Sequence, residues 1–154
     1  MDVPHRSSDA IRLGRLATDI GFLLRMAQVK VYERYFREYG DRHIKPGEFS
    51  VLWTISHNPG IRQNVLCQEL IIKRSHMTKL LRSMENRELV SRRVPDEDRR
   101  GVELTITDKG QSLVDEIAPW FFAFEDCLGA KMNASDREEL KAQLLKFIAS
   151  ESAD

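Results

Sequence analysis

Basic side chains gather where one of the predicted helices begins. Lys73 and Arg74 stand at the start of residues 74–87, in which apolar positions recur at helical spacing. Cations at a helix start cost roughly 0.3 kcal/mol or more each, because unpaired N–H groups already make that end positive. A bound anion reverses this effect, so the segment predicts contacts with nucleic-acid phosphates and base edges. The residues expected to make these contacts are Lys73, Arg74, Ser75, His76, Thr78, Lys79 and Arg82.

A second group of charges, with the sequence DEDRR, lies between two segments that alternate as strands, residues 89–94 and 102–106. A carboxylate beside an arginine can hold the guanidinium extended, which reduces the entropy lost when that side chain enters a narrow minor groove. We therefore interpret Asp98 as a positioning residue, and Arg99 and Arg100 as contacts to a groove or to phosphate.

The charges of the chain are distributed unevenly, although the net charge is zero. Residues 1–61 carry 9 basic and 7 acidic side chains, and residues 62–100 carry 10 basic and 6 acidic ones. Residues 108–154 carry 5 basic and 10 acidic side chains. Because salt screens charges over about 8 Å, a basic face can attract DNA despite an acidic region elsewhere.

Length and composition describe one globular protein. The chain has 154 residues, of which 42% are hydrophobic and 31% charged. No apolar run approaches the roughly 20 residues that span a bilayer, and the N-terminal residues do not read as a secretion signal. The two cysteines, Cys67 and Cys127, provide no disulfide framework, so we expect a protein of the reducing cytoplasm without a membrane partner.

Helical periodicity and capping signals divide the chain into six helices. They are expected over residues 11–39, 46–57, 62–70, 74–87 and 107–132, with the sixth starting at a capping box of Ser135 and Glu138. Pro119 should kink or split the fifth helix, because proline removes a helical hydrogen bond.

These elements predict a mainly α fold with a small antiparallel β-wing. It is a winged helix-turn-helix flanked by long N- and C-terminal dimerisation helices, which are apolar enough to need a second subunit. We assign residues 1–44 to the dimerisation region, residues 45–108 to DNA binding, and residues 109–154 to the C-terminal dimerisation helices.

The chain resembles the MarR family of bacterial transcription regulators. The stretch LCQELIIKRSHMTKLLRSMENRELV resembles the family's helix-turn-helix, and VPDEDRRGVELTITDKG resembles its wing, including Thr107 and Gly110 at the next helix start. The resemblance implies a homodimer, most simply a repressor, on a palindromic double-stranded operator with half-sites about 10 base pairs apart. Ile71 and Glu88 depart from the family, which usually has glycine there. A non-glycine residue in a left-handed conformation costs on the order of 1 kcal/mol.

The resemblance also implies control by a small molecule, such as an aromatic carboxylate or a thioester, bound beside the DNA-binding module. An aromatic cleft with a cation would suit an aromatic acid. The candidate ligand-binding residues are Arg25, Tyr32, Phe49, Trp53 and His57. The alternative is that Phe49 and Trp53 are ordinary core residues.

Other functions have weaker support in the sequence. A redox-responsive regulator would need a reactive thiol, but we expect Cys67 to be buried, and Glu125 and Asp126 would not stabilise a thiolate at Cys127. A winged helix that binds protein would expose apolar anchors in place of basic residues. No catalytic residues, metal ligands or cofactor motif are predicted, so we expect no enzyme.

Overall fold

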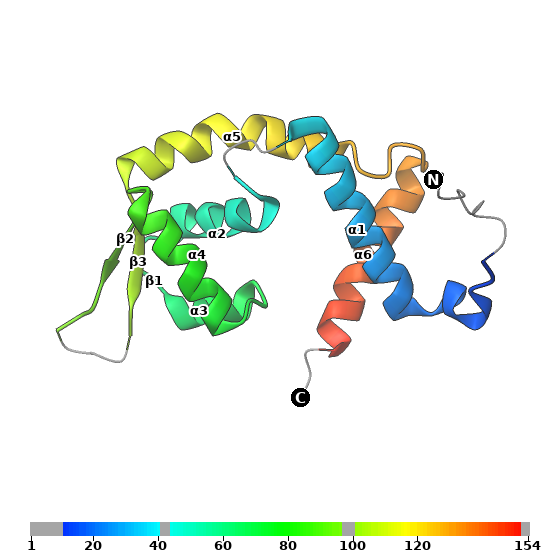
Figure 1. Ribbon diagram of the computed structural model, residues 1–154, viewed down its shortest axis with the longest axis horizontal. Helices are drawn as coiled ribbons and strands as arrows, with labels where there is room; N and C mark the ends of the chain where they lie inside the picture. The colour runs from blue at the N-terminus through cyan, green and yellow to red at the C-terminus, as the bar shows by residue number, and fades with distance from the viewer. Residues whose placement is uncertain (1–10, 41–43, 97–100, 152–154) are drawn as a thin grey trace, which may run out of the picture. The chain divides into compact units, whose positions relative to one another are not determined.

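The computed structural model describes residues 11–40, 44–96 and 101–151 (Figure 1). The chain divides into two compact units, residues 1–41 and residues 42–154. None of the described helices combines the length and the apolar character that a membrane span requires.

The first unit consists of the short 3-10 helix η2 (Gly14–Thr18) and the α-helix α1 (Ile20–Tyr39). The prediction of one continuous helix over residues 11–39 is therefore wrong at its N-terminal end. Gly14 takes a left-handed conformation with φ of 57°, and Asp19 is extended with ψ of 130°. Both conformations interrupt the helical backbone, so the regular helix is 20 residues long.

Three helices precede the wing in the second unit: α2 (Pro46–His57), α3 (Gln63–Glu69) and α4 (Arg74–Asn86). The helix α2 begins at its proline, as predicted, because proline fits the first helical turn. Its start is held by a hydrogen bond of 2.9 Å from the Lys45 N–H to the Glu48 carboxylate.

The wing belongs to a three-stranded antiparallel sheet with strand order β1-β3-β2. The strands are β1 (Ile61–Arg62), β2 (Val90–Arg93) and β3 (Glu103–Ile106). The two predicted strands are confirmed as β2 and β3, and Val90 pairs with Ile106 in their register. The strand β1 was not predicted, because two residues are too few to show an alternating pattern.

In two turns, a residue other than glycine adopts a left-handed conformation. Ile71, after α3, has φ of 52°, and Glu88, after α4, has φ of 61°. In the first turn the Ile72 N–H donates to the Cys67 carbonyl at 3.0 Å. In the second turn the Leu89 N–H donates to the Met84 carbonyl at 2.9 Å. Both are the six-residue closures typical of glycine-terminated helices. Both turns therefore have the geometry of a glycine turn, at a backbone cost of about 1 kcal/mol each.

The helix α5 (Asp108–Asp126) begins where it was predicted, with Thr107 as its N-cap. The Thr107 hydroxyl accepts a hydrogen bond of 3.0 Å from the Gly110 N–H. Pro119 lies inside the helix and does not split it. The helix ends at Asp126, six residues before the predicted end at residue 132.

The helix α6 (Ala134–Glu151) starts differently from the prediction. Its first turn is capped by Asn133, whose side-chain oxygen accepts a hydrogen bond of 2.7 Å from the Asp136 N–H. The predicted capping box of Ser135 and Glu138 is therefore wrong. Asparagine caps helices as well as serine does, and it stands two residues earlier in the chain.

Candidate nucleic-acid interface

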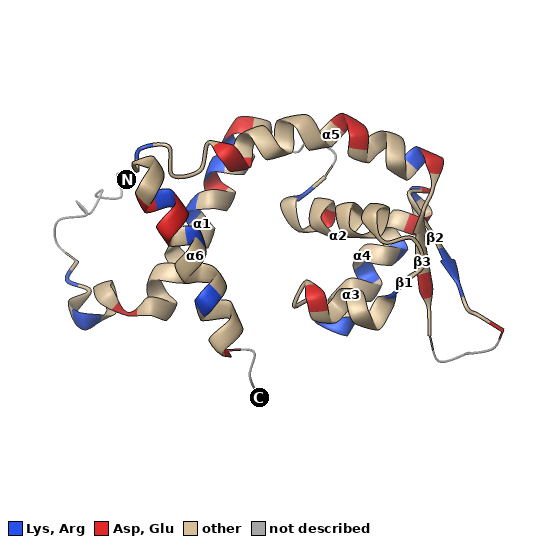
Figure 2. Cartoon of the chain, turned by 180° about the vertical axis from the view of Figure 1, so that it is seen from behind, with Lys and Arg blue, Asp and Glu red and all other residues tan. Residues whose placement is uncertain are grey.

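The helix α4, whose lysine and arginine positions are blue in Figure 2, carries exposed basic side chains together with its N-cap residue Lys73. The opposite side is anchored by Met77, Leu81 and Met84, each at most 1% exposed. These positions share one helix face, so their burial fixes which side chains point outward. The exposed members of the predicted set are Lys73, Arg74, Ser75, His76, Lys79 and Arg82.

The cations of this face are available to a ligand. None of Lys73, Arg74, Lys79 and Arg82 forms an ion pair within the part of the chain that the structure describes. Basic residues on α1 and α6, by contrast, pair with carboxylates three or four residues away. Positive side chains clustered on one face without carboxylate partners attract a polyanion.

Thr78, the remaining member of the predicted set on α4, is half-buried and already hydrogen-bonded. Its hydroxyl donates to the Arg74 carbonyl at 2.9 Å and accepts from the Gln63 side-chain nitrogen at 3.3 Å. Because a hydroxyl has one proton, Thr78 has none left to donate to a base. Its methyl group remains suited to contact with thymine.

A polar network that was not predicted from the sequence continues from Thr78 to the wing. The Gln63 side-chain oxygen accepts a hydrogen bond of 3.3 Å from Arg92 on β2. The same guanidinium pairs with the Glu85 carboxylate of α4 at 3.3 Å. No periodic pattern marks these residues, because they come from three elements far apart in the sequence.

The described strands add further positive charge beside α4. Arg93 on β2 is exposed, as is Arg62 on β1. A Cβ placed on Gly101 would lie 3.4 Å from the Arg62 guanidinium carbon, so this guanidinium lies against the backbone at the base of the wing. The predicted contacts at the wing tip, Asp98, Arg99 and Arg100, lie outside the described residues.

Aromatic rings of α2 and α5 form one cluster. Phe49 is buried, and its ring centroid lies 4.2 Å from that of Phe121. Trp53 lies between the rings of His57 and Phe122, at centroid distances of 4.2 Å and 4.8 Å. Phe122 is 39% exposed, so the cluster reaches the surface.

The other two predicted ligand-binding residues belong to α1, in the first unit. Tyr32 is 39% exposed, with its ring centroid 6.5 Å from that of Phe36. Arg25 is exposed, and its guanidinium lies 4.0 Å from the sulfur of Met26. The structure therefore brings Phe49, Trp53 and His57 together. Arg25 and Tyr32 belong to the first unit.

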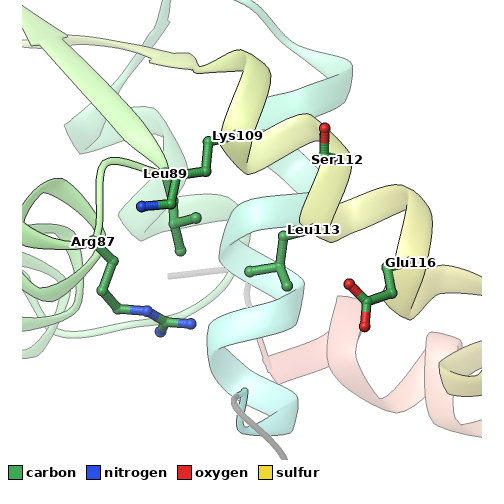
Figure 3. A pocket seen from close by; sticks show the side chains of 6 residues that line it. All are labelled: Arg87, Leu89, Lys109, Ser112, Leu113 and Glu116. Carbon is green, nitrogen blue, oxygen red and sulfur yellow. The ribbon is translucent and has the colours of Figure 1, made fainter.

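A tightly built junction joins the turn after α4 to the start of α5. The Thr107 hydroxyl donates to the Glu88 carbonyl at 2.6 Å, and Lys109 pairs with the Glu88 carboxylate at 3.0 Å. Beside it lies an open hollow of about 450 Å³. Figure 3 shows its aliphatic side chains, Leu89 and Leu113, between Arg87 and Glu116.

Both cysteines are free thiols. Cys67 is half-buried, which corrects the prediction that it is buried, and Cys127 is exposed. Close to Cys127 in the chain, partial burial and the neighbouring Asp126 raise the pKa of Glu125. Among the described residues, no three histidine, cysteine or acidic side chains gather as metal ligands.

Comparison with known proteins agrees with this architecture. The MarR family model matches residues 44–102. The structure of the transcriptional repressor CouR bound to a 23-mer DNA duplex matches with a TM-score of 0.80 and 28% identity, covering 90% of this chain and 98% of CouR. The DNA-binding region of this chain is therefore similar to that of the MarR family. The resemblance seen in the sequence is confirmed, as is the mainly α fold with a small antiparallel wing.

Two other similar proteins extend the comparison. A protein of Thauera aromatica, named "Putative transcriptional regulatory protein for hcr operon", is 25% identical over 140 residues, which are 90% of this chain and 84% of that protein. BpsR of Bordetella bronchiseptica, whose DNA binding is regulated by 6-hydroxynicotinic acid, shares the fold with a TM-score of 0.79 and 21% identity. That match covers 85% of this chain and 94% of BpsR.

Proposed function

We propose that this MarR-family regulator binds double-stranded DNA as a homodimer and represses transcription from a palindromic operator. The observation that carries the proposal is the outward face of α4, where Lys73, Arg74, Lys79 and Arg82 have no carboxylate partner among the described residues. A helix of this kind fits the major groove, where basic and polar side chains meet phosphates and base edges. Ser75, His76 and Lys79 are the candidates for base contacts.

The dimer would be built by residues 1–44 and 109–154, while residues 45–108 bind DNA. Large apolar side chains are exposed on the terminal helices of the single chain: Ile20 is 62% exposed, Leu145 is 69% exposed and Ile148 is 50% exposed. Water contact with so many apolar groups is unfavourable, and burial against a second copy removes it.

The wing would place Asp98, Arg99 and Arg100 beside each recognition helix, with Asp98 orienting the arginines toward a flanking minor groove. Such a protein controls transcription by binding and release, without catalysis or a cofactor, and acts in the cytoplasm where the chromosome lies.

DNA binding is tested with the duplex that lies upstream of the gene for this chain. Affinity should fall steeply as salt rises, because lysine and arginine displace counterions from phosphate. Protection should cover two half-sites whose centres are about 10 base pairs apart. An affinity that does not change with salt concentration, or protection of a single half-site by a monomer, would contradict the proposal.

A small aromatic acid or thioester is the proposed effector, bound near the aromatic cluster. Phe49, Trp53 and His57 supply stacked rings, and Arg25 and Tyr32 of α1 would supply a cation and a hydroxyl.

The pocket is tested by titrating a panel of aromatic carboxylates against the preformed DNA complex. Trp53→Leu should keep DNA binding and lose the response to the active compound. A Trp53→Leu protein that releases DNA at the wild-type ligand concentration would show that the pocket lies elsewhere.

A further inference from the structure

We propose that Gln63 is a positioning residue that holds α4 and the wing strand β2 in one orientation, and so sets the preference of this protein for its operator. The inference rests on the proposed DNA-binding function. Gln63 is the first residue of α3 and is not itself expected to read a base.

The contacts of Gln63 reach the helix-turn-helix and the wing at once. Its backbone N–H donates to the Val102 carbonyl, next to β3, at 2.9 Å. Its side-chain nitrogen donates to the Thr78 hydroxyl of α4 at 3.3 Å, and its side-chain oxygen accepts from Arg92 of β2 at 3.3 Å. One half-buried side chain therefore joins α3, α4 and β2.

The chemistry of the two partners demands an amide at this position. Thr78 gives its proton to the Arg74 carbonyl at 2.9 Å, so its oxygen can only accept from residue 63. Arg92 has no acceptor, so residue 63 must accept from it. A carboxylate could satisfy only Arg92, and an ammonium could satisfy only Thr78. Glutamine satisfies both.

The ion pair between Arg92 and Glu85 completes the connection from the wing back to α4. The two side chains are 29% and 30% exposed, which leaves them partly shielded from water. Because Glu85 lies two turns beyond Thr78, the network holds α4 at two points along its length. This arrangement restrains rotation of α4 against β2.

The network borders the DNA-facing side of the module. Gln63, Arg74 and Thr78 line an open hollow of about 260 Å³ between the starts of α3 and α4. Release of Thr78 would let its methyl group move, and release of Arg92 would let the wing shift against the recognition helix. Both changes affect sequence readout more than the general attraction to phosphate, which depends on exposed charge.

The test compares Gln63→Met with Gln68→Met, a change of the same kind at an exposed position of the same helix. Each protein is titrated against the duplex that the wild type selects from a random library, and against a scrambled duplex of equal composition. Gln63→Met should bind the selected duplex about tenfold more weakly, because DNA binding must then restore the orientation that the two hydrogen bonds hold in the free protein. Its affinity for the scrambled duplex and its salt dependence should stay at the values of Gln68→Met, while its melting temperature should fall because two hydrogen bonds of the folded protein are lost.

Two further variants separate positioning from a structural role. Gln63→Glu keeps the acceptor for Arg92 and cannot donate to Thr78, and its preference for the selected duplex should also fall. In Gln63→Met/Thr78→Val the two losses should not add, since both changes break the same hydrogen bond.

The outcomes are distinguishable from failure of DNA binding itself. A Gln63→Met protein with the wild-type ratio of the two affinities overturns the positioning role, as does an equal loss on both duplexes or an additive double variant. A wild-type protein that selects no duplex overturns the proposed function instead.

Discussion

Gly110→Ala should force apart the start of α5 and the turn that follows α4. A Cβ at this position would lie 2.1 Å from the Leu89 carbonyl oxygen and 2.8 Å from the Ile106 Cγ1 atom. The first neighbour is a backbone atom, so no side-chain rotation relieves the overlap. The chain must open by roughly 1 Å or more, because non-bonded heavy atoms rest at about 3.5 Å.

The expected cost follows from the hydrogen bonds at this junction. Thr107 donates its N–H to Leu89 at 3.1 Å and its hydroxyl to Glu88 at 2.6 Å, and it accepts from the Gly110 N–H at 3.0 Å. Each such bond contributes about 1 kcal/mol, so opening the junction costs about 3 kcal/mol. Alanine returns up to about 1 kcal/mol through its higher helix propensity. The free energy of unfolding should therefore fall by about 2 kcal/mol.

Urea unfolding at one fixed protein concentration measures this change, and Gly47→Ala in α2 is the matched control. Apart from the adjacent residues and the backbone of α2, no atom of the described residues lies within 4 Å of a Cβ placed on Gly47, so that variant should be as stable as the wild type or up to about 1 kcal/mol more stable. If Gly110→Ala unfolded at the same urea concentration as Gly47→Ala, the reasoning about this junction would be refuted.

Three further changes test other parts of the account. Ile71→Gly should raise the free energy of unfolding by about 1 kcal/mol in urea titrations, because glycine adopts the observed φ of 52° without strain; no gain would argue against a left-handed turn. Glu125 has a raised pKa, so its proton is held more tightly in the folded protein and stability is lost as pH rises above the ordinary glutamate range. Glu125→Gln should therefore melt at a higher temperature than the wild type near about pH 7 and at a similar one near about pH 4, whereas a difference independent of pH would exclude this cause. Asn133→Ala should cost about 1 kcal/mol through loss of the α6 cap, and Ser135→Ala should cost little; equal effects would show that the cap is assigned wrongly.

The parts of the fold that sequence predicted are those that local periodicity dictates. The apolar spacing in α4 placed Met77, Leu81 and Met84 on one face, and their burial in turn placed the basic residues outside. The threonine before α5 identified that helix start, because its side chain caps the helix within three residues. These signals require no knowledge of distant parts of the chain.

The parts that sequence missed depend on conformations or partners that no local pattern reveals. The N-terminal helix was predicted too long because a glycine inside an apolar stripe can either continue a helix or leave it, and Gly14 leaves it with φ of 57°. Gln63 was overlooked because its partners, Thr78 and Arg92, lie 15 and 29 residues away. Only the folded chain brings the three side chains together.

The salt dependence of DNA binding tests the central claim most directly, if the wild type is compared with Lys73→Ala/Arg74→Ala on the operator duplex. If both of these basic side chains meet phosphate in each subunit, four contacts are lost per dimer, and the slope of log affinity against log salt should fall in magnitude by about 3.6. Lys131→Ala/Lys146→Ala, two exposed lysines outside α4, should leave the slope unchanged. Equal slopes for the wild type and the α4 variant would contradict the assignment of this helix face to DNA.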